Sequence, residues 1–240
     1  MNEGAGRVYG VDGCPRGWAV VAVDPVGPPR PELTLRTSLD GLVASGAVVA
    51  IDIPIGLPER IVGPGRAAEQ AVRPLLAARQ SSVFSVPSRR AVFETDYAAA
   101  CATALATSDP PRRVSRQAFQ LFRKVREVDA LLSAATQGTV FECHAEVAFW
   151  RLNGERAMPT AKRVRGVPTR EGLAERIALL VDHSVEATFF HDLPRGVPLI
   201  DAVDAAAIAL VARGCAAGVA RPFPDPPDVD GRGLRIAIWA

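Results

Sequence analysis

The sequence predicts a mixed α/β fold in which helices cover a central sheet. Two apolar runs at residues 7–12 and 17–23, joined by the turn GCPR, are typical of a β-hairpin. Further apolar runs then alternate with segments of helical periodicity, which is the order of an α/β layer fold. The chain has 240 residues, no internal repeat and no long linker. We therefore expect a single domain over residues 1–240.

In the first half of the chain, the hairpin is followed by two more strands and a helical region. LTLRT at 33–37 is expected to be the third strand, and residues 38–45 a short helix. The fourth run, VVAIDI at 48–53, is apolar nearly throughout, which suits a strand covered on both faces. Helices expected at 66–78, 92–106 and 114–135 form a helical insertion at about 64–136.

The second half contains one more buried strand and two strong helices. TVFECHAEVAFWRL at 139–152 predicts a strand that runs into a helix. Helices are expected near 170–182 and over 199–218, where Gly218 is a suitable stop. The Pro-rich stretch at 221–233 is expected to be a loop, and LRIAIW at 234–239 a final edge strand.

Composition limits the classes of protein. The chain has 28 Lys and Arg against 26 Asp and Glu, a balance too even to indicate a nucleic-acid partner from charge alone. No apolar stretch approaches the roughly 20 residues of a membrane helix, and MNEGAGR shows no secretory signal. We expect a cytoplasmic protein without a membrane partner. The scattered cysteines are expected to be isolated reduced thiols: Cys14, Cys101, Cys143 and Cys215.

Five carboxylates interrupt apolar surroundings. Asp12, Asp52 and Glu142 stand at or near the ends of apolar runs, and Asp201 and Asp204 lie three residues apart on the last helix. A carboxylate in such surroundings is unfavourable unless it is paired or binds a metal. Strand interiors disfavour aspartate in particular. The pattern predicts an acidic pocket, although for Asp204 an ordinary structural role is an equal alternative.

An acidic pocket repels itself, and a divalent cation removes that repulsion. Ligands that are all oxygen suit Mg²⁺ or Mn²⁺ better than zinc. Two such ions, about 3.5–4 Å apart, stabilise the attacking and leaving oxygens of a phosphodiester. The sequence therefore favours a metal-dependent nuclease.

Six segments in order resemble the DUF429 family of predicted nucleases, which is assigned to the ribonuclease H-like superfamily. They are GVDGCPRGW, IDIPIGLPE, RQSSVFSVPSR, QLFRKVREVD, ECHAEVAF and the late DAVDA helix. The resemblance implies a sheet with three antiparallel strands and a fourth parallel to the first. It also implies acids on the first strand, after the fourth strand and on the last helix. Asp12, Asp52 and Asp201 match these places, and Asp204 is a further candidate metal ligand.

Two blocks depart from the family pattern. Glu142, His144 and Glu146 stand where the family usually has E-V-H-P-E, but Ala145 replaces the proline. We interpret this as a change in backbone stiffness. Glu142 and His144 remain candidate catalytic residues, and His144 is equally compatible with simple pairing to its acidic neighbours. Glu69 replaces the usual aspartate, and its longer side chain argues against a direct metal role.

The loop between the first two helices of the insertion carries groups that suit phosphate. Arg79, Ser81, Ser82 and Arg89 are the candidate phosphate-binding residues. The alternative is a solvated loop anchored by Phe84. The basic cluster around Lys162 has two interpretations, a contact with a nucleic-acid backbone or a solvated loop, and the solvated loop is the simpler one.

The sequence leaves several alternatives open. The predicted partner is a nucleic acid, DNA or RNA, and a homodimer is compatible with the chain. A non-catalytic or nucleotide/phosphate-binding protein of the same fold is the main alternative. A sugar-kinase-like arrangement needs a second homologous domain, for which 240 residues leave no room.

Overall fold

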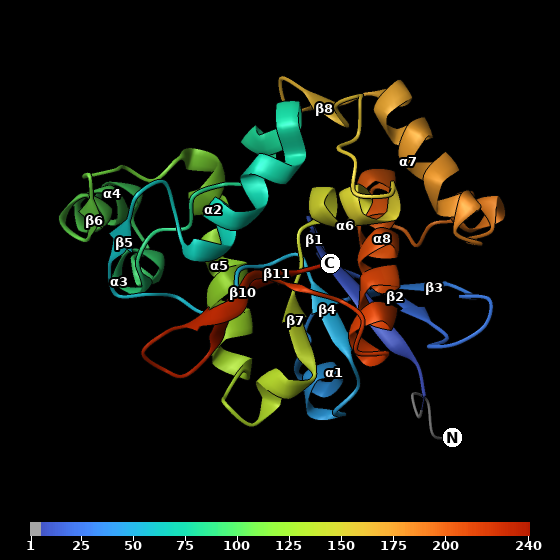
Figure 1. The fold of residues 1–240 in the computed structure, drawn as a ribbon, viewed down its shortest axis with the longest axis horizontal. Helices are drawn as coiled ribbons and strands as arrows, with labels where there is room; N and C mark the ends of the chain where they lie inside the picture. The colour runs from blue at the N-terminus through green and yellow to red at the C-terminus, as the bar shows by residue number, and fades with distance from the viewer. Residues whose placement is uncertain (1–5) are drawn as a thin grey trace.

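The computed structural model describes residues 6–240 and centres on a mixed five-stranded sheet (Figure 1). Its strand order is β3-β2-β1-β4-β7. The strands are β1 (Val8–Cys14), β2 (Gly17–Val23), β3 (Glu32–Arg36), β4 (Val49–Ile51) and β7 (Val140–Glu142). The first three strands are antiparallel, β4 is parallel to β1, and β7 is parallel to β4. The expected mixed sheet, with a fourth strand parallel to the first, is confirmed.

Helices cover both faces of the sheet because successive strand residues point to opposite sides. Tyr9 and Val11 pack on one face against helices that include α1 and α5, whereas Val8 and Ala50 pack on the other against α6 and α8. The helices are α1 (Asp40–Ala44), α2 (Ala67–Val72), α3 (Arg89–Phe93), α4 (Tyr97–Ala106), α5 (Arg116–Leu131), α6 (Ala145–Leu152), α7 (Arg170–Asp182) and α8 (Leu199–Ala216).

Short elements complete the described chain. The 3-10 helices are η1 (Arg73–Ser82), η2 (Thr136–Gly138) and η3 (Ala187–Phe190). The small strand pairs are β5 (Ile61–Val62) with β6 (Ser108–Asp109), β8 (Arg163–Val164) with β9 (Val167–Pro168), and β10 (Pro222–Val229) with β11 (Arg235–Trp239). No helix within residues 6–240 is long and apolar enough to cross a bilayer.

Two expected helices are shorter than the sequence pattern suggested. The helix expected at 66–78 is α only to Val72 and continues as η1, where Pro74 lacks the N–H that an α-helix needs. The helix expected at 92–106 is two helices, α3 and α4. Asp96 separates them because its side chain accepts a hydrogen bond from Ala99 N and caps α4.

The expectation of a loop at 221–233 is wrong, because residues 222–229 form β10 and pair with β11. Pairing is confined to the two ends of β10, and its register shifts between Phe223 and Asp228. The prolines of this stretch that follow Phe223 fall in the irregular segment, where no ladder N–H is required. The expected strand at 234–239 is confirmed as β11.

Helix α8 crosses β1 unusually closely, and Gly10 makes this approach possible. A Cβ atom at Gly10 would lie 2.1 Å from the backbone nitrogen of Ala209 and 2.3 Å from the carbonyl oxygen of Ala205. Any side chain at this position would therefore displace the helix backbone. This contact fixes α8 over the sheet and places its N-terminal turns near the end of β1.

Candidate functional site

Asp12 and Asp52 lie at the same edge of the sheet. Asp12 lies near the end of β1, and Asp52 directly follows β4. Because β1 and β4 are parallel and Val11 pairs with Ile51, the two aspartates come side by side. The backbone N–H of Asp52 donates to Val11 O at 2.9 Å. The carboxyl edge of parallel strands is where α/β sheets usually bind ligands.

The alternation of the strands turns both aspartates toward α8. Asp12 follows Gly10 by two residues and Asp52 follows Ala50 by two, so they share the face that α8 covers. Asp201 and Asp204 lie in the first turns of α8 and are buried. The close approach of this helix therefore adds two carboxylates to those at the sheet edge.

The four carboxylates repel one another electrostatically. Burial raises the pKa of Asp12 well above its usual range, and repulsion from Asp52, Asp204 and Asp201 raises it further. Burial and then Asp204 raise the pKa of Asp201 to about 6. The structure thus brings Asp12, Asp52, Asp201 and Asp204, which come from distant parts of the chain, to one edge of the sheet.

Lys162 supplies positive charge to this cluster. Its ammonium forms an ion pair with Asp204 and lies 3.8 Å from Oε1 of Glu146. Although burial lowers the pKa of Lys162, these two carboxylates raise it above its ordinary value. Glu146 in turn receives two hydrogen bonds from Arg176, at 2.8 and 2.7 Å. The solvated-loop interpretation of Lys162 is thus wrong for this residue.

The donor set fits a hard divalent cation, although no group of three His, Cys, Asp or Glu within residues 6–240 is arranged ready to hold one. Asp204 Oδ1 is buried and has no hydrogen-bond partner among the described residues. A buried carboxylate oxygen without a partner is a site where a cation is strongly favoured. Asp12, Asp52, Asp201 and Asp204 are the residues that would hold Mg²⁺ or Mn²⁺.

Glu142 belongs to a different ion-pair network. It pairs with Ile51, which faces away from α8, so its side chain turns to the opposite side of the sheet from Asp52. Arg66 Nη2 donates to Glu142 Oε1 at 2.5 Å and also contacts Glu69 Oε1 at 2.6 Å. Burial raises the pKa of Glu142 to about 7, against the opposing effect of Arg66.

His144 stands between the sheet edge and η1. It immediately precedes α6, and its Nε2 lies 3.3 Å from the carbonyl oxygen of Ser82. Its Nδ1 is buried and unpaired in the part of the chain that the structure describes. Asp52 is next to it, because Asp52 Oδ2 accepts a hydrogen bond from Ala145 N at 3.1 Å. His144 therefore has one ring nitrogen available for other chemistry.

A cavity of about 460 Å³ opens at this edge. Its wall includes Asp12, Asp52, Glu142, His144 and Lys162, together with Arg79, Ser81 and Ser82 from η1. Asp201 and Asp204 lie outside this wall, beside Asp12 and Lys162. Three of the four candidate phosphate-binding residues are therefore brought to the cavity.

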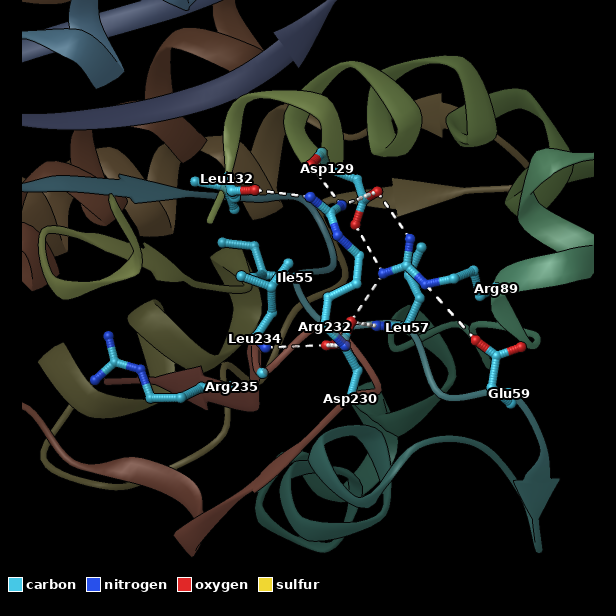
Figure 2. Close-up of polar contacts among 12 residues, drawn as sticks. Ile55, Leu57, Glu59, Arg89, Asp129, Leu132, Asp230, Arg232, Leu234 and Arg235 are labelled. Atoms are coloured by element: carbon cyan, nitrogen blue, oxygen red, sulfur yellow. Dashed lines mark hydrogen bonds and ion pairs between the residues drawn. The ribbon is translucent and has the colours of Figure 1, made fainter. Parts of the chain in front are cut away.

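The fourth, Arg89, lies elsewhere. Figure 2 shows its guanidinium between Asp129 and Asp230, with contacts of 2.8–3.0 Å. Asp129 also pairs with Arg232, and Asp230 accepts hydrogen bonds from the backbone N–H groups of Leu57 and Leu234. Arg89 is not part of the cavity wall, and its donors are committed to joining α3, α5 and the C-terminal segment.

Sequence reasoning missed Arg66, Arg176 and the position of Lys162. Each pairs with an acid far away in the chain, for example Arg66 with Glu142 and Arg176 with Glu146. The only local signal was the spacing of Arg66 and Glu69, three residues apart at the start of α2. Such a pair is common at helix starts and does not indicate a cavity.

Fold and site together define a mixed α/β protein with carboxylates gathered at the carboxyl edge of its sheet. The chain belongs to the family described as "Protein of unknown function (DUF429)", which matches residues 10–229. Neither a curated protein nor a solved structure matches the chain.

Proposed function

We propose that this protein is a metal-dependent phosphodiester hydrolase, a nuclease, of ribonuclease H-like architecture. One observation carries the proposal. Carboxylates from β1, from the end of β4 and from α8 gather in one buried cluster, where burial first and then repulsion from Asp52, Asp204 and Asp201 raise the pKa of Asp12 well above its usual range. Natural proteins rarely keep such repulsion without a use for it, and perturbed carboxylates in a cleft are typical of functional sites.

The architecture supports the superfamily assignment. Three antiparallel strands are followed by a fourth parallel to the first, as the resemblance to this superfamily implies. Asp12 on β1, Asp52 after β4 and Asp201 on α8 occupy the three expected places. A shared fold does not by itself fix an activity, so the chemistry must be argued from the site.

Asp12, Asp52, Asp201 and Asp204 would hold the cation. When bound, Mg²⁺ or Mn²⁺ supplies Lewis acidity to a phosphoryl oxygen and lowers the pKa of a bound water. Arg79, Ser81 and Ser82 lie on the cavity wall, where they would bind and orient the phosphate. His144, with its unpaired Nδ1 inside the described chain, would deliver a proton to the leaving oxygen.

Metal-linked stability tests the site. Mg²⁺ or Mn²⁺ should raise the melting temperature of the wild-type protein, and Asp12→Asn should abolish this rise, because the ion binds the folded state alone. Glu142→Gln is the control and should keep the metal-linked rise, since Glu142 lies on the other face of the sheet and pairs with Arg66. A rise that survives Asp12→Asn argues against this site.

Cleavage tests the activity. The purified protein should slowly cleave a single-stranded or branched nucleic acid in Mn²⁺, and Asp52→Asn should remove that activity. A panel of DNA and RNA substrates then decides the type of nucleic acid. Cleavage that persists in Asp52→Asn comes from a contaminant and removes the support for the proposal.

A non-catalytic, nucleotide- or phosphate-binding protein is the second candidate. The ion pair between Lys162 and Asp204 favours it, because the cluster already contains a positive charge without a metal. This candidate predicts saturable binding of ATP and no cleavage. The mass of the purified protein in solution tests whether the chain forms the homodimer that the sequence leaves open.

A further inference from the structure

The cavity has an apolar wall that phosphodiester hydrolysis does not require. Phe84, Val86 and Pro87 from the segment after η1, and Leu121, Phe122 and Val125 from α5, line the side away from α8. Asp12, Asp52 and Lys162 line the same cavity. The cavity therefore combines a charged floor with an apolar wall.

Phe84 is the most exposed residue of this wall. Its exposed fraction is 36%, whereas Phe122 and Val125 are buried and Leu121 is partly buried. Hydrophobic and aromatic side chains are the usual lining of small-molecule pockets, where they contact the ligand. Flat aromatic faces stack on nucleobases, and such stacking tolerates any base.

Arg79 differs from Arg66 and Arg176, two other arginines near the sheet edge. Arg66 and Arg176 are each held by buried carboxylates. The Nε of Arg79 is buried, lies in the cavity wall and has no hydrogen-bond partner within residues 6–240. A guanidinium without a carboxylate is free to bind a phosphate through two parallel hydrogen bonds.

The volume limits what the cavity accepts. At about 460 Å³ it falls in the range of small-molecule sites, about 300–1,000 Å³. Bases within a duplex are stacked and paired, so they reach a walled cavity only after they leave the helix. An unpaired nucleotide presents a base, a sugar and a phosphate together.

We propose that the cavity binds one unpaired nucleotide of the substrate, with its base against Phe84 and Leu121 and a phosphate at Arg79. The proposal rests on the proposed nuclease function and narrows its substrate to single-stranded ends or flaps. A scissile phosphodiester then lies at the floor, where Asp12 and Asp52 line the cavity. Continuous duplex is excluded because its bases cannot enter.

Binding to the Asp52→Asn protein in chelator tests this without cleavage. The probes are labelled oligothymidylate and oligouridylate of about 12 nucleotides, within the usual range of single-strand sites, and a blunt duplex of equal length. We expect at least tenfold tighter binding of a single strand than of the duplex. Adding Phe84→Ala should weaken single-strand binding about tenfold, and adding Arg79→Met should weaken it and reduce its salt dependence.

Phe93→Ala is the matched control, since Phe93 is exposed but lies outside the cavity wall. Equal affinity for the duplex, or single-strand binding unchanged by both cavity variants at unchanged melting temperature, overturns the proposal. The two proposals fail separately. Selective binding without wild-type cleavage removes the nuclease function alone, whereas cleavage inside a continuous duplex removes the single-nucleotide site alone.

Discussion

The ammonium of Lys162 is paired with the carboxylate of Asp204, which connects the β8–β9 segment to the acidic cluster over α8. Only one oxygen of Asp204 is used in this pair, and the other is buried without a partner in the described part of the chain. Lys162 therefore offsets part of the repulsion among the aspartates. A bound cation and this ammonium would relieve the same repulsion.

Lys162→Met should lower stability in chelator and enlarge the effect of metal. Removing one member of a buried ion pair leaves an uncompensated charge, which costs about 3–5 kcal/mol. Mg²⁺ or Mn²⁺ should then raise the melting temperature more than in the wild type. The control is Arg165→Met, which removes a charge from an exposed residue of the same segment. A metal-linked rise smaller than in the wild type would show that Lys162 assists metal binding.

The stability of the metal-free protein should depend on pH through Asp201. The folded-state pKa of this carboxyl is about 6, compared with an ordinary 3.8. Because the folded-state pKa is raised, the protonated carboxyl of Asp201 stabilises the folded protein fully below about pH 4. This stabilisation is lost as the pH rises through about 6. A difference of about two pKa units corresponds to about 3 kcal/mol of destabilisation at pH 7.

Asp201→Asn should therefore stabilise the chelated protein at pH 7, by up to about 3 kcal/mol, and have little effect at pH 4. Urea unfolding at the two pH values measures this difference. Asp192→Asn, an exposed position, controls for the loss of one negative charge. If Asp201→Asn raised the free energy of unfolding equally at both pH values, the ionised carboxylate of Asp201 would not be destabilised by its surroundings.

The sequence predicted the acids that converge, because that prediction needs only strand ends and topology. Asp12 and Asp52 each end an apolar run, and parallel strands bring such ends to one edge. The sequence did not show which face each acid occupies. Glu142 ends its strand in the same way, yet the register that pairs it with Ile51 turns it toward Arg66. Register depends on contacts between strands that lie far apart in the chain.

The sequence also did not predict which residues pair with the buried charges. Lys162 lies in a stretch that resembles a solvated basic loop, and only the packing of that stretch over α8 brings it to Asp204. The β10 strand was missed for a similar reason, since its prolines disfavour a strand and only its two ends pair with β11. Local propensity decides neither case, because tertiary contacts override it.

Arg89→Met should lower stability without changing nucleic-acid binding. Arg89 joins Asp129 to Asp230, and its loss would leave Asp230 without a cationic partner, at a cost of about 3 kcal/mol. Arg90→Met, at the exposed neighbouring position, should have a small effect. Chemical unfolding measures stability, and the binding of labelled oligonucleotides measures affinity. Weaker nucleic-acid binding by Arg89→Met at unchanged stability would show that Arg89 does bind phosphate.

Gly10→Ala tests whether the position of α8 assembles the acidic site. The new methyl group would overlap the backbone of Ala205 and Ala209, at 2.3 and 2.1 Å, and a helix backbone cannot move aside as a flexible side chain does. Overpacking typically costs about 1–3 kcal/mol, and we expect the upper end here. Displacement of α8 should also separate Asp201 and Asp204 from Asp12, so the metal-linked rise in melting temperature should shrink.

Gly41→Ala is the matched control for this substitution. Gly41 lies within α1, and a Cβ there meets open space, so the change should stabilise the protein by about 0.5–1 kcal/mol. Its metal response should equal that of the wild type, because α1 packs on the other face of the sheet. If Gly10→Ala keeps both wild-type stability and the full metal response, α8 does not press on β1, and the aspartates must be brought together by something other than this contact.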